Sequence, residues 1–109
     1  MTNRNYNNGR AFEYRVIRKI EALGWRCIRS AGSHTPIDII AGKDGKVLGF
    51  QCKGAGAKLS REAWNSFWWC CKEFGCTPIL VRRGMEFVQL TGPYTVENKL
   101  PDAIKISIK

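Results

Sequence analysis

Residues 36–53 read PIDIIAGKDGKVLGFQCK, two short apolar runs on either side of an Asp-Gly pair. Apolar runs that flank Asp-Gly are typical of a β-hairpin with a tight turn, and we predict that structure here. Three polar residues occupy unusual places on it: Asp38 lies inside the first run, and Gln51 and Lys53 stand two apart at the end of the second. Because side chains alternate along a strand, Gln51 and Lys53 project from the same face. An acid, an amide and an amine gathered on one hairpin indicate a functional site.

The composition is that of an ordinary globular protein with a strong excess of positive charge. The chain has 109 residues, enough for one domain with a single core. Its 18 Lys and Arg residues outnumber 9 Asp and Glu, which gives a formal net charge of +9. Such an excess favours a polyanionic partner, either nucleic acid or an anionic membrane surface, and a purely solubilising role is the alternative.

Targeting signals and cysteine spacing narrow the class of protein. The chain has no apolar run of about 18 residues, and its first residues lack the apolar core of a secretory signal. We therefore expect a cytoplasmic protein that does not span a membrane. The five cysteines are odd in number and form no C-x-x-C pair, so we expect reduced thiols rather than a disulfide framework or a structural zinc site.

Apolar spacing and turn residues predict the remaining elements. In chain order we expect a flexible stretch (1–8), a helix (9–23), a strand (25–29), the hairpin (36–53), a helix (61–74), a second hairpin (77–90) and an edge strand (103–109). Ser60 is suited to cap the second helix, and Gly75 to end it. This order predicts fold class α/β, a single domain with one mixed β-sheet flanked by helices.

The second predicted helix is unusually rich in aromatic residues. Trp64, Phe67, Trp68 and Trp69 give it a wider apolar surface than one packing stripe requires. Tryptophans can stack on nucleic-acid bases, or they can fill a core and a subunit interface. We favour core and interface, because base-stacking aromatic residues usually stand among exposed polar neighbours and these adjoin two cysteines.

The polar residues of the hairpin have the chemistry that phosphodiester cleavage needs. Mg²⁺ and Mn²⁺ prefer oxygen ligands, and such an ion supplies an activated water and neutralises charge on the phosphate. Asp38 is the best ligand candidate, and Glu13 can approach it from the edge of the inward face of the first helix. The amide oxygen of Gln51 and the backbone carbonyl of Cys52 could complete the protein ligands. Lys53 could orient the attacking water or stabilise developing charge, although each residue alone also suits a purely structural role.

Four short motifs carry a family resemblance. They are Gly9-x3-Glu13, the loop Arg29-Ser30-Ala31-Gly32-Ser33, the strand PIDIIA at residues 36–41, and Gln51-Cys52-Lys53. In order and approximate spacing, over about residues 9–83, they resemble the archaeal-type Holliday junction resolvases of the PD-(D/E)XK nuclease superfamily. The resemblance implies a restriction-endonuclease-like fold and a homodimer. It further implies Mg²⁺- or Mn²⁺-dependent nicking of four-way DNA junctions, without a small-molecule cofactor.

The resemblance also implies roles for individual residues. By position, the catalytic residues are Glu13, Ser33, Asp38, Gln51 and Lys53, and the metal ligands are Glu13, Asp38, Gln51 and the Cys52 carbonyl. The aromatic helix supplies part of the dimer interface through Trp64, Phe67 and Trp68. We expect DNA contacts from Arg10, Arg29, His34, Lys58 and Arg61.

Two departures from the family pattern bear on these expectations. Gln51 stands where the family usually has glutamate, which removes one negative charge from the metal site, and Ile37 separates Pro36 from Asp38. A neutral amide oxygen still binds Mg²⁺ or Mn²⁺, though more weakly. The alternatives to a junction resolvase are a restriction-type or general DNA endonuclease of the same fold, and a DNA-binding module whose catalytic site has decayed.

Overall fold

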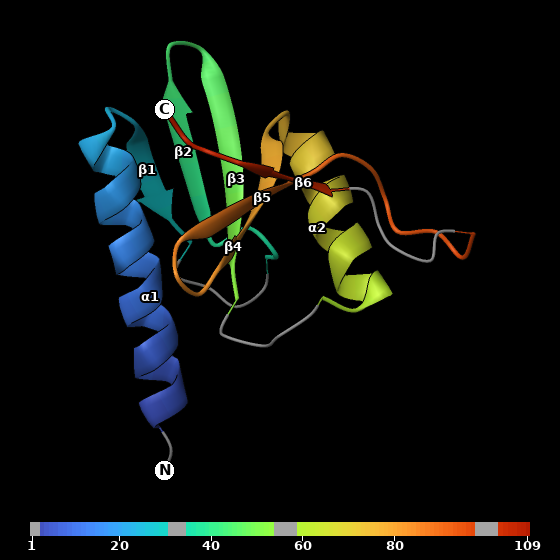
Figure 1. Cartoon of the computed structure of the whole chain (residues 1–109), viewed down its shortest axis with the longest axis horizontal. Coiled ribbons are helices and arrows are strands. Elements are labelled where there is room, and N and C mark those ends of the chain that lie inside the picture. The colour runs from blue at the N-terminus through green and yellow to red at the C-terminus, as the bar shows by residue number, and fades with distance from the viewer. Residues whose placement is uncertain (1–2, 31–34, 54–58, 98–102) are drawn as a thin grey trace.

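The computed structural model describes residues 3–30, 35–53, 59–97 and 103–109, with side chains from residue 9 onward (Figure 1). This described part contains two helices, α1 (Asn3–Ala22) and α2 (Arg61–Phe74). It also contains six strands: β1 (Arg26–Arg29), β2 (Ile39–Lys43), β3 (Lys46–Cys52), β4 (Thr77–Arg82), β5 (Glu86–Leu90) and β6 (Ala103–Ile106). Neither described helix combines the length and the apolar character that a membrane-spanning helix needs.

The strands form one sheet in the order β1-β2-β3-β4-β5-β6. Neighbouring strands are antiparallel except β3 and β4, which are parallel because α2 connects them. The predicted mixed α/β sheet flanked by helices is therefore confirmed. One boundary was wrong: α1 begins at Asn3 and not near Gly9. The segment before Gly9 contains no proline, so nothing in it forces the backbone out of the helix.

The β2–β3 hairpin forms as predicted from its Asp-Gly turn. Asp44 and Gly45 both have positive φ, 52° and 79°, which is the mirror-image turn that fits the right-handed twist of paired strands. The turn fixes the register in which Ile39 lies opposite Phe50. Asp38, which directly precedes β2, and Cys52, which ends β3, are thereby brought together at one end of the hairpin.

Each helix covers one face of the sheet (Figure 1). The α1 side has a core in which Phe12, Val16 and Ile20 pack with Ile39, Ala41, Phe50, Ile79 and Val81. The α2 side has a second core in which Trp64, Phe67, Trp68 and Cys71 pack with Leu80, Val88 and Leu90. Adjacent residues of β4 belong to different cores, so the two cores lie on opposite faces.

Helix α2 is capped as predicted. The Ser60 hydroxyl accepts a hydrogen bond from the Ala63 N–H at 3.1 Å, and Gly75 ends the helix with φ 68°. Close packing under the helix leaves no space for a side chain at Gly49, where a Cβ would lie 2.8 Å and 2.9 Å from the Cys76 and Cys71 sulfurs. The thiols of this core therefore act as small apolar groups.

The predicted dimer interface through Trp64, Phe67 and Trp68 is wrong as to its residues. Their relative exposures are only 5%, 0% and 8%, because all three pack into the core of their own chain. Helical spacing places these three side chains on one face and turns Trp69 to the outside, where it is 57% exposed. Any contact between copies through α2 must use its outer residues.

Candidate functional site

Asp38 is held just before β2 by hydrogen bonds to β3 and to Ser30, the residue that follows β1. Its backbone N–H donates to the Phe50 carbonyl at 2.8 Å, and its carbonyl accepts from the Ser30 N–H at 2.8 Å. Its carboxylate Oδ2 accepts from the Cys52 N–H at 2.8 Å. The carboxylate is therefore positioned by backbone groups, and the residue that it contacts lies between Gln51 and Lys53.

The electrostatic surroundings of Asp38 disfavour its ionised form. Burial raises the pKa of Asp38 to about 6, and the negative charge of Glu13 adds to this. The Cys52 N–H and the positive charges of Lys53 and Arg29 act in the opposite direction and only partly compensate. A buried carboxylate of this kind gains strongly from an added cation, which would bring its pKa down again.

Glu13 reaches the site as part of an ion pair. Its Oε1 accepts from Arg29 Nε at 2.8 Å, and both side chains are only 18% exposed. The guanidinium also lies 5.2 Å from the centre of the Tyr14 ring. This pair links the middle of α1 to the end of β1, and it holds the Glu13 carboxylate near enough to Asp38 for its charge to raise the Asp38 pKa. The role of Glu13 as a metal ligand stays a prediction. The predicted contact of Arg29 with DNA stays a prediction, and its Nε is already engaged by Glu13.

Gln51 turns its side chain away from α1. It lies beside Leu80 of β4, which belongs to the α2-side core, whereas Cys52 lies beside Val81 of the α1-side core. The amide oxygen of Gln51 is buried and has no hydrogen-bond partner among the described residues. An unpartnered buried oxygen is costly, so it indicates a position where a cation or a water belongs.

Cys52 and Lys53 continue the line of β3 past Asp38. Burial raises the pKa of the Cys52 thiol far above its ordinary value, and the charges of Asp38 and Glu13 raise it further. The thiol is therefore protonated, and its pKa reports that both carboxylates are near. The Lys53 N–H donates to the Val81 carbonyl at 2.9 Å, which keeps the residue aligned with the sheet.

The oxygen atoms of the site suit a hard divalent cation that keeps part of its hydration shell. The described residues contain no group of three or more His, Cys, Asp and Glu that could hold a metal ion. The acidic side chains that meet here are two, Glu13 and Asp38, and Glu13 Oε1 is shared with Arg29. Mg²⁺ is usually bound by one or two carboxylates with several waters, so Asp38 and the orphaned Gln51 oxygen fit such an ion.

The remaining predicted residues fall into two groups. Ser33, His34 and Lys58 lie outside the described residues. Arg10 is exposed on α1, and Arg61 begins α2 with its guanidinium 5.2 Å from the centre of the Tyr94 ring. Their roles toward DNA stay predictions.

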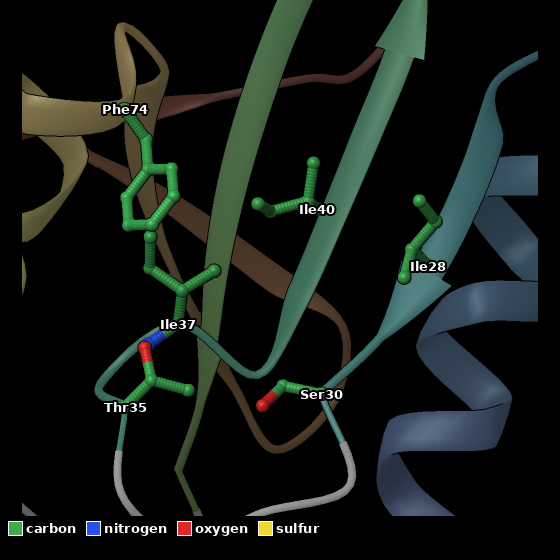
Figure 2. Close-up of a pocket in the computed structure, with 6 residues that line it drawn as sticks. All are labelled: Ile28, Ser30, Thr35, Ile37, Ile40 and Phe74. Atoms are coloured by element: carbon green, nitrogen blue, oxygen red, sulfur yellow. The ribbon is translucent and has the colours of Figure 1, made fainter.

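An apolar surface beside the site was missed by sequence reasoning. Ile28 is 72% exposed and Phe74 65% exposed, and both line a cavity of about 240 Å³ together with Ser30, Thr35, Ile37 and Ile40 (Figure 2). The wide apolar surface of the aromatic helix was the available signal. This signal identified the helix that contributes Phe74, but the sequence could not show that Ile28 of β1 would lie across from it.

Comparisons with known proteins agree with this fold. A family model described as archaeal Holliday junction resolvase (Hjc) matches residues 4–107. The crossover junction endodeoxyribonuclease Hjc of Methanocaldococcus jannaschii is 48% identical over 48 residues, which cover 44% of this chain and only 35% of that relative.

Solved structures give the same result at the level of fold. The structure of Archaeoglobus fulgidus Hjc, a Holliday junction resolvase, aligns over 72% of each chain with a TM-score of 0.59 and 23% sequence identity. A bacterial homing endonuclease covers 93% of this chain and 76% of its own, but its TM-score of 0.47 and identity of 11% are too low to support an argument. Because the family model spans nearly the whole sequence, the chain belongs to the archaeal Holliday junction resolvase family.

Proposed function

We propose that this protein is a metal-dependent endonuclease that nicks four-way DNA junctions as a homodimer. The observation that carries the proposal is the site at the end of the β2–β3 hairpin. There the Asp38 carboxylate is fixed by the Cys52 N–H, and the neighbouring Gln51 presents a buried oxygen without a partner in the described part of the chain. The excess of 9 positive charges suits a DNA substrate.

The residues of the site divide the chemistry among them. A bound Mg²⁺ or Mn²⁺ would supply charge neutralisation at the phosphate and an activated water. Asp38 and Gln51 would hold the ion, and Glu13 would add negative charge from the side of α1, where Arg29 fixes its position. Lys53 would place an ammonium group beside the phosphate and stabilise the charge that develops there.

The proposal is tested with a synthetic four-way junction and a linear duplex of the same sequence. We expect nicks in the junction when Mg²⁺ or Mn²⁺ is present, and none in EDTA. Equal cleavage of the linear duplex would contradict junction selectivity and favour a general nuclease. Binding without cleavage in either metal would favour a DNA-binding module.

The role of Gln51 leads to a prediction about metal affinity. Gln51→Glu should tighten Mn²⁺ binding by at least about tenfold, because a unit charge a few ångströms from a divalent ion contributes more than 1 kcal/mol even when the effective dielectric constant is about 20. The same change should lower the Tm of the metal-free protein, because it adds a third carboxylate to Glu13 and Asp38 and places it where a buried amide stood. Isothermal titration with Mn²⁺ and thermal unfolding in EDTA measure the two effects.

Gln89→Glu is the matched control for this variant. It adds the same charge to β5 of the same sheet, away from the hairpin end that holds Asp38, and it should leave Mn²⁺ affinity unchanged. Unchanged or weaker Mn²⁺ binding in Gln51→Glu would show that the amide oxygen is no metal ligand.

The exposed apolar surface at Ile28 and Phe74 is the surface that we propose for dimer formation. Both side chains are more than half exposed, and large exposed apolar patches mark interaction sites. A twofold dimer would present two sites to the two opposing strands of a nearly twofold junction. If the dimer interface continues along α2, Trp69 on the outer side of that helix would be part of it.

Ile28→Ser/Phe74→Ser should therefore convert the dimer to a monomer at micromolar concentration. In a twofold interface each substitution acts twice, and truncation of a central apolar side chain costs about 2 kcal/mol or more. Sedimentation equilibrium measures the change, and Val96→Ser, at a residue that is 74% exposed elsewhere, is the control. A variant that sediments as the wild-type dimer would place the interface on another surface.

A further inference from the structure

The two ends of the β2–β3 hairpin have different chemistry. One end holds Asp38 and Cys52, and the other end is the turn at Asp44 and Gly45, which stands at the top of Figure 1. A shallow recess of about 490 Å³ surrounds this turn. Its charged lining residues are three cations, Arg26, Lys43 and Lys46, and one acid, Asp44. The recess is therefore net positive, although it lies outside the catalytic site.

The cations of the recess are not equivalent. Lys43 has a structural role, because its side chain is engaged within the chain. Its Nζ donates to the Leu23 carbonyl at 2.8 Å and lies 5.8 Å from the centre of the Trp25 ring. Arg26 and Lys46 are exposed, and neither makes an ion pair or a side-chain hydrogen bond with another described residue. Lys46 directly follows the turn, and Arg26 lies opposite Gly42 in the neighbouring strand β1, so two exposed cations beside the turn are available to an anionic partner.

The distance from this recess to the catalytic site follows from the strands. Asp38 and Lys43 are separated by five residue steps along β2, or about 17 Å at about 3.3 Å per residue. Helix α1 gives an independent value, because Glu13 contacts Arg29 at the site and the Leu23 carbonyl contacts Lys43 at the tip. Ten residues of helix at about 1.5 Å each span about 15 Å.

A span of about 17 Å corresponds to about five base pairs of duplex at about 3.4 Å per base pair, close to half a helical turn. We propose that Arg26 and Lys46 bind phosphates of the duplex arm that leads away from the nick, about half a turn from it. This inference rests on the proposed junction-nicking function, and it adds a second DNA-binding surface that positions the arm. Glycines form much of the remaining lining, so the backbone of the duplex can approach the two cations closely.

The test compares Arg26→Ala/Lys46→Ala with the control Lys72→Ala/Arg83→Ala, which removes two exposed cations from α2 and from the β4–β5 turn. Binding is measured in EDTA on four-way junctions with long arms, as a function of salt. We expect the slope of log K against log salt to fall by about 0.9 for each phosphate that the variant no longer neutralises, and Kd to rise on the order of tenfold. The control should keep the wild-type slope.

Arm length supplies the second measurement. Wild-type affinity should fall when the arms are cut to less than about half a helical turn beyond the nick, and the Arg26→Ala/Lys46→Ala variant should not distinguish long from short arms. Wild-type binding and salt slope in the double variant, or an equal decrease in affinity on long and short arms, would overturn the inference and leave the recess to another anionic partner. Because binding is read without metal, a protein that binds junctions but never nicks them refutes the proposed activity without removing this test.

Discussion

An Asp38→Asn variant is expected to nick a four-way junction roughly 10³-fold more slowly than the wild-type protein, while it still binds the junction. The reason is the loss of the carboxylate that would hold the metal ion, whose charge stabilisation is worth several kcal/mol, and about 4 kcal/mol corresponds to about 10³ in rate. Asparagine keeps an oxygen that can accept from the Cys52 N–H, so the end of the hairpin should stay in place. Nicking and binding are measured on the same labelled junction, with and without Mn²⁺.

The same substitution should make the metal-free protein more stable at pH 8. Burial, with a contribution from Glu13, raises the pKa of Asp38 from 3.8 to about 6, so the fold favours the protonated form. The stability that protonation adds is complete below about pH 4 and is lost as the pH rises through about 6. At pH 8 the wild-type protein carries a charge that the fold disfavours by about 1–2 kcal/mol after allowance for partial solvent contact, and the neutral asparagine does not.

This prediction is read from Tm in EDTA across pH 4 to 8. The variant should unfold on the order of 5–10 °C higher than the wild-type protein at pH 8. The difference should disappear toward pH 4, where Asp38 is protonated in the folded wild-type protein. Glu97→Gln is the control, because it also replaces a carboxylate by an amide, at an exposed residue outside both the site and the recess, and it should leave nicking unaffected. Retained nicking, or a lower Tm at pH 8, would contradict the assignment of Asp38.

The local parts of this fold could be predicted because their signals are local. The Asp-Gly pair specifies the turn of the β2–β3 hairpin, and Ser60 and Gly75 specify the ends of α2. The start of α1 could not be predicted, since an Asn-rich segment without proline favours neither helix nor coil strongly. The exposure of the aromatic residues in α2 was equally out of reach, because it depends on which side of the helix meets the sheet.

The residues of the site also fall into those that the sequence could place and those whose position depends on tertiary packing. Asp38, Gln51 and Lys53 share one hairpin, so the sequence could place them together. The ion pair between Glu13 and Arg29 joins α1 to β1, and its geometry follows from tertiary packing. Gln51 is the informative case: alternation shows that it shares a face with Lys53, but only the pairing of β3 with β4 shows that its oxygen is buried on the α2 side. A search of the sequence for acidic metal ligands would miss the Gln51 oxygen, because an amide carries no charge.

Lys53→Met is expected to reduce nicking roughly 10²–10³-fold, the usual cost of removing one group that stabilises charge in the transition state. Methionine keeps most of the length of the side chain but has no ammonium group. The Lys53 N–H, which donates to the Val81 carbonyl, belongs to the backbone and is unaffected. Metal binding and the fold should therefore persist. Single-turnover rates at saturating protein separate this decrease from any change in junction affinity.

The acid limb of the pH–rate profile distinguishes an electrostatic role of the Lys53 side chain from a structural one. The positive charge of Lys53 is one of the influences that lower the pKa of Asp38, so removal of the ammonium should raise that pKa further. Because metal binding needs the ionised carboxylate, the limb should move to higher pH in Lys53→Met and stay in place in Lys53→Arg, which keeps the charge. A role confined to packing would slow both variants without moving the limb. If the limb of Lys53→Met does not move, the ammonium does not act on the carboxylate, and the cation that lowers the pKa of Asp38 must be Arg29.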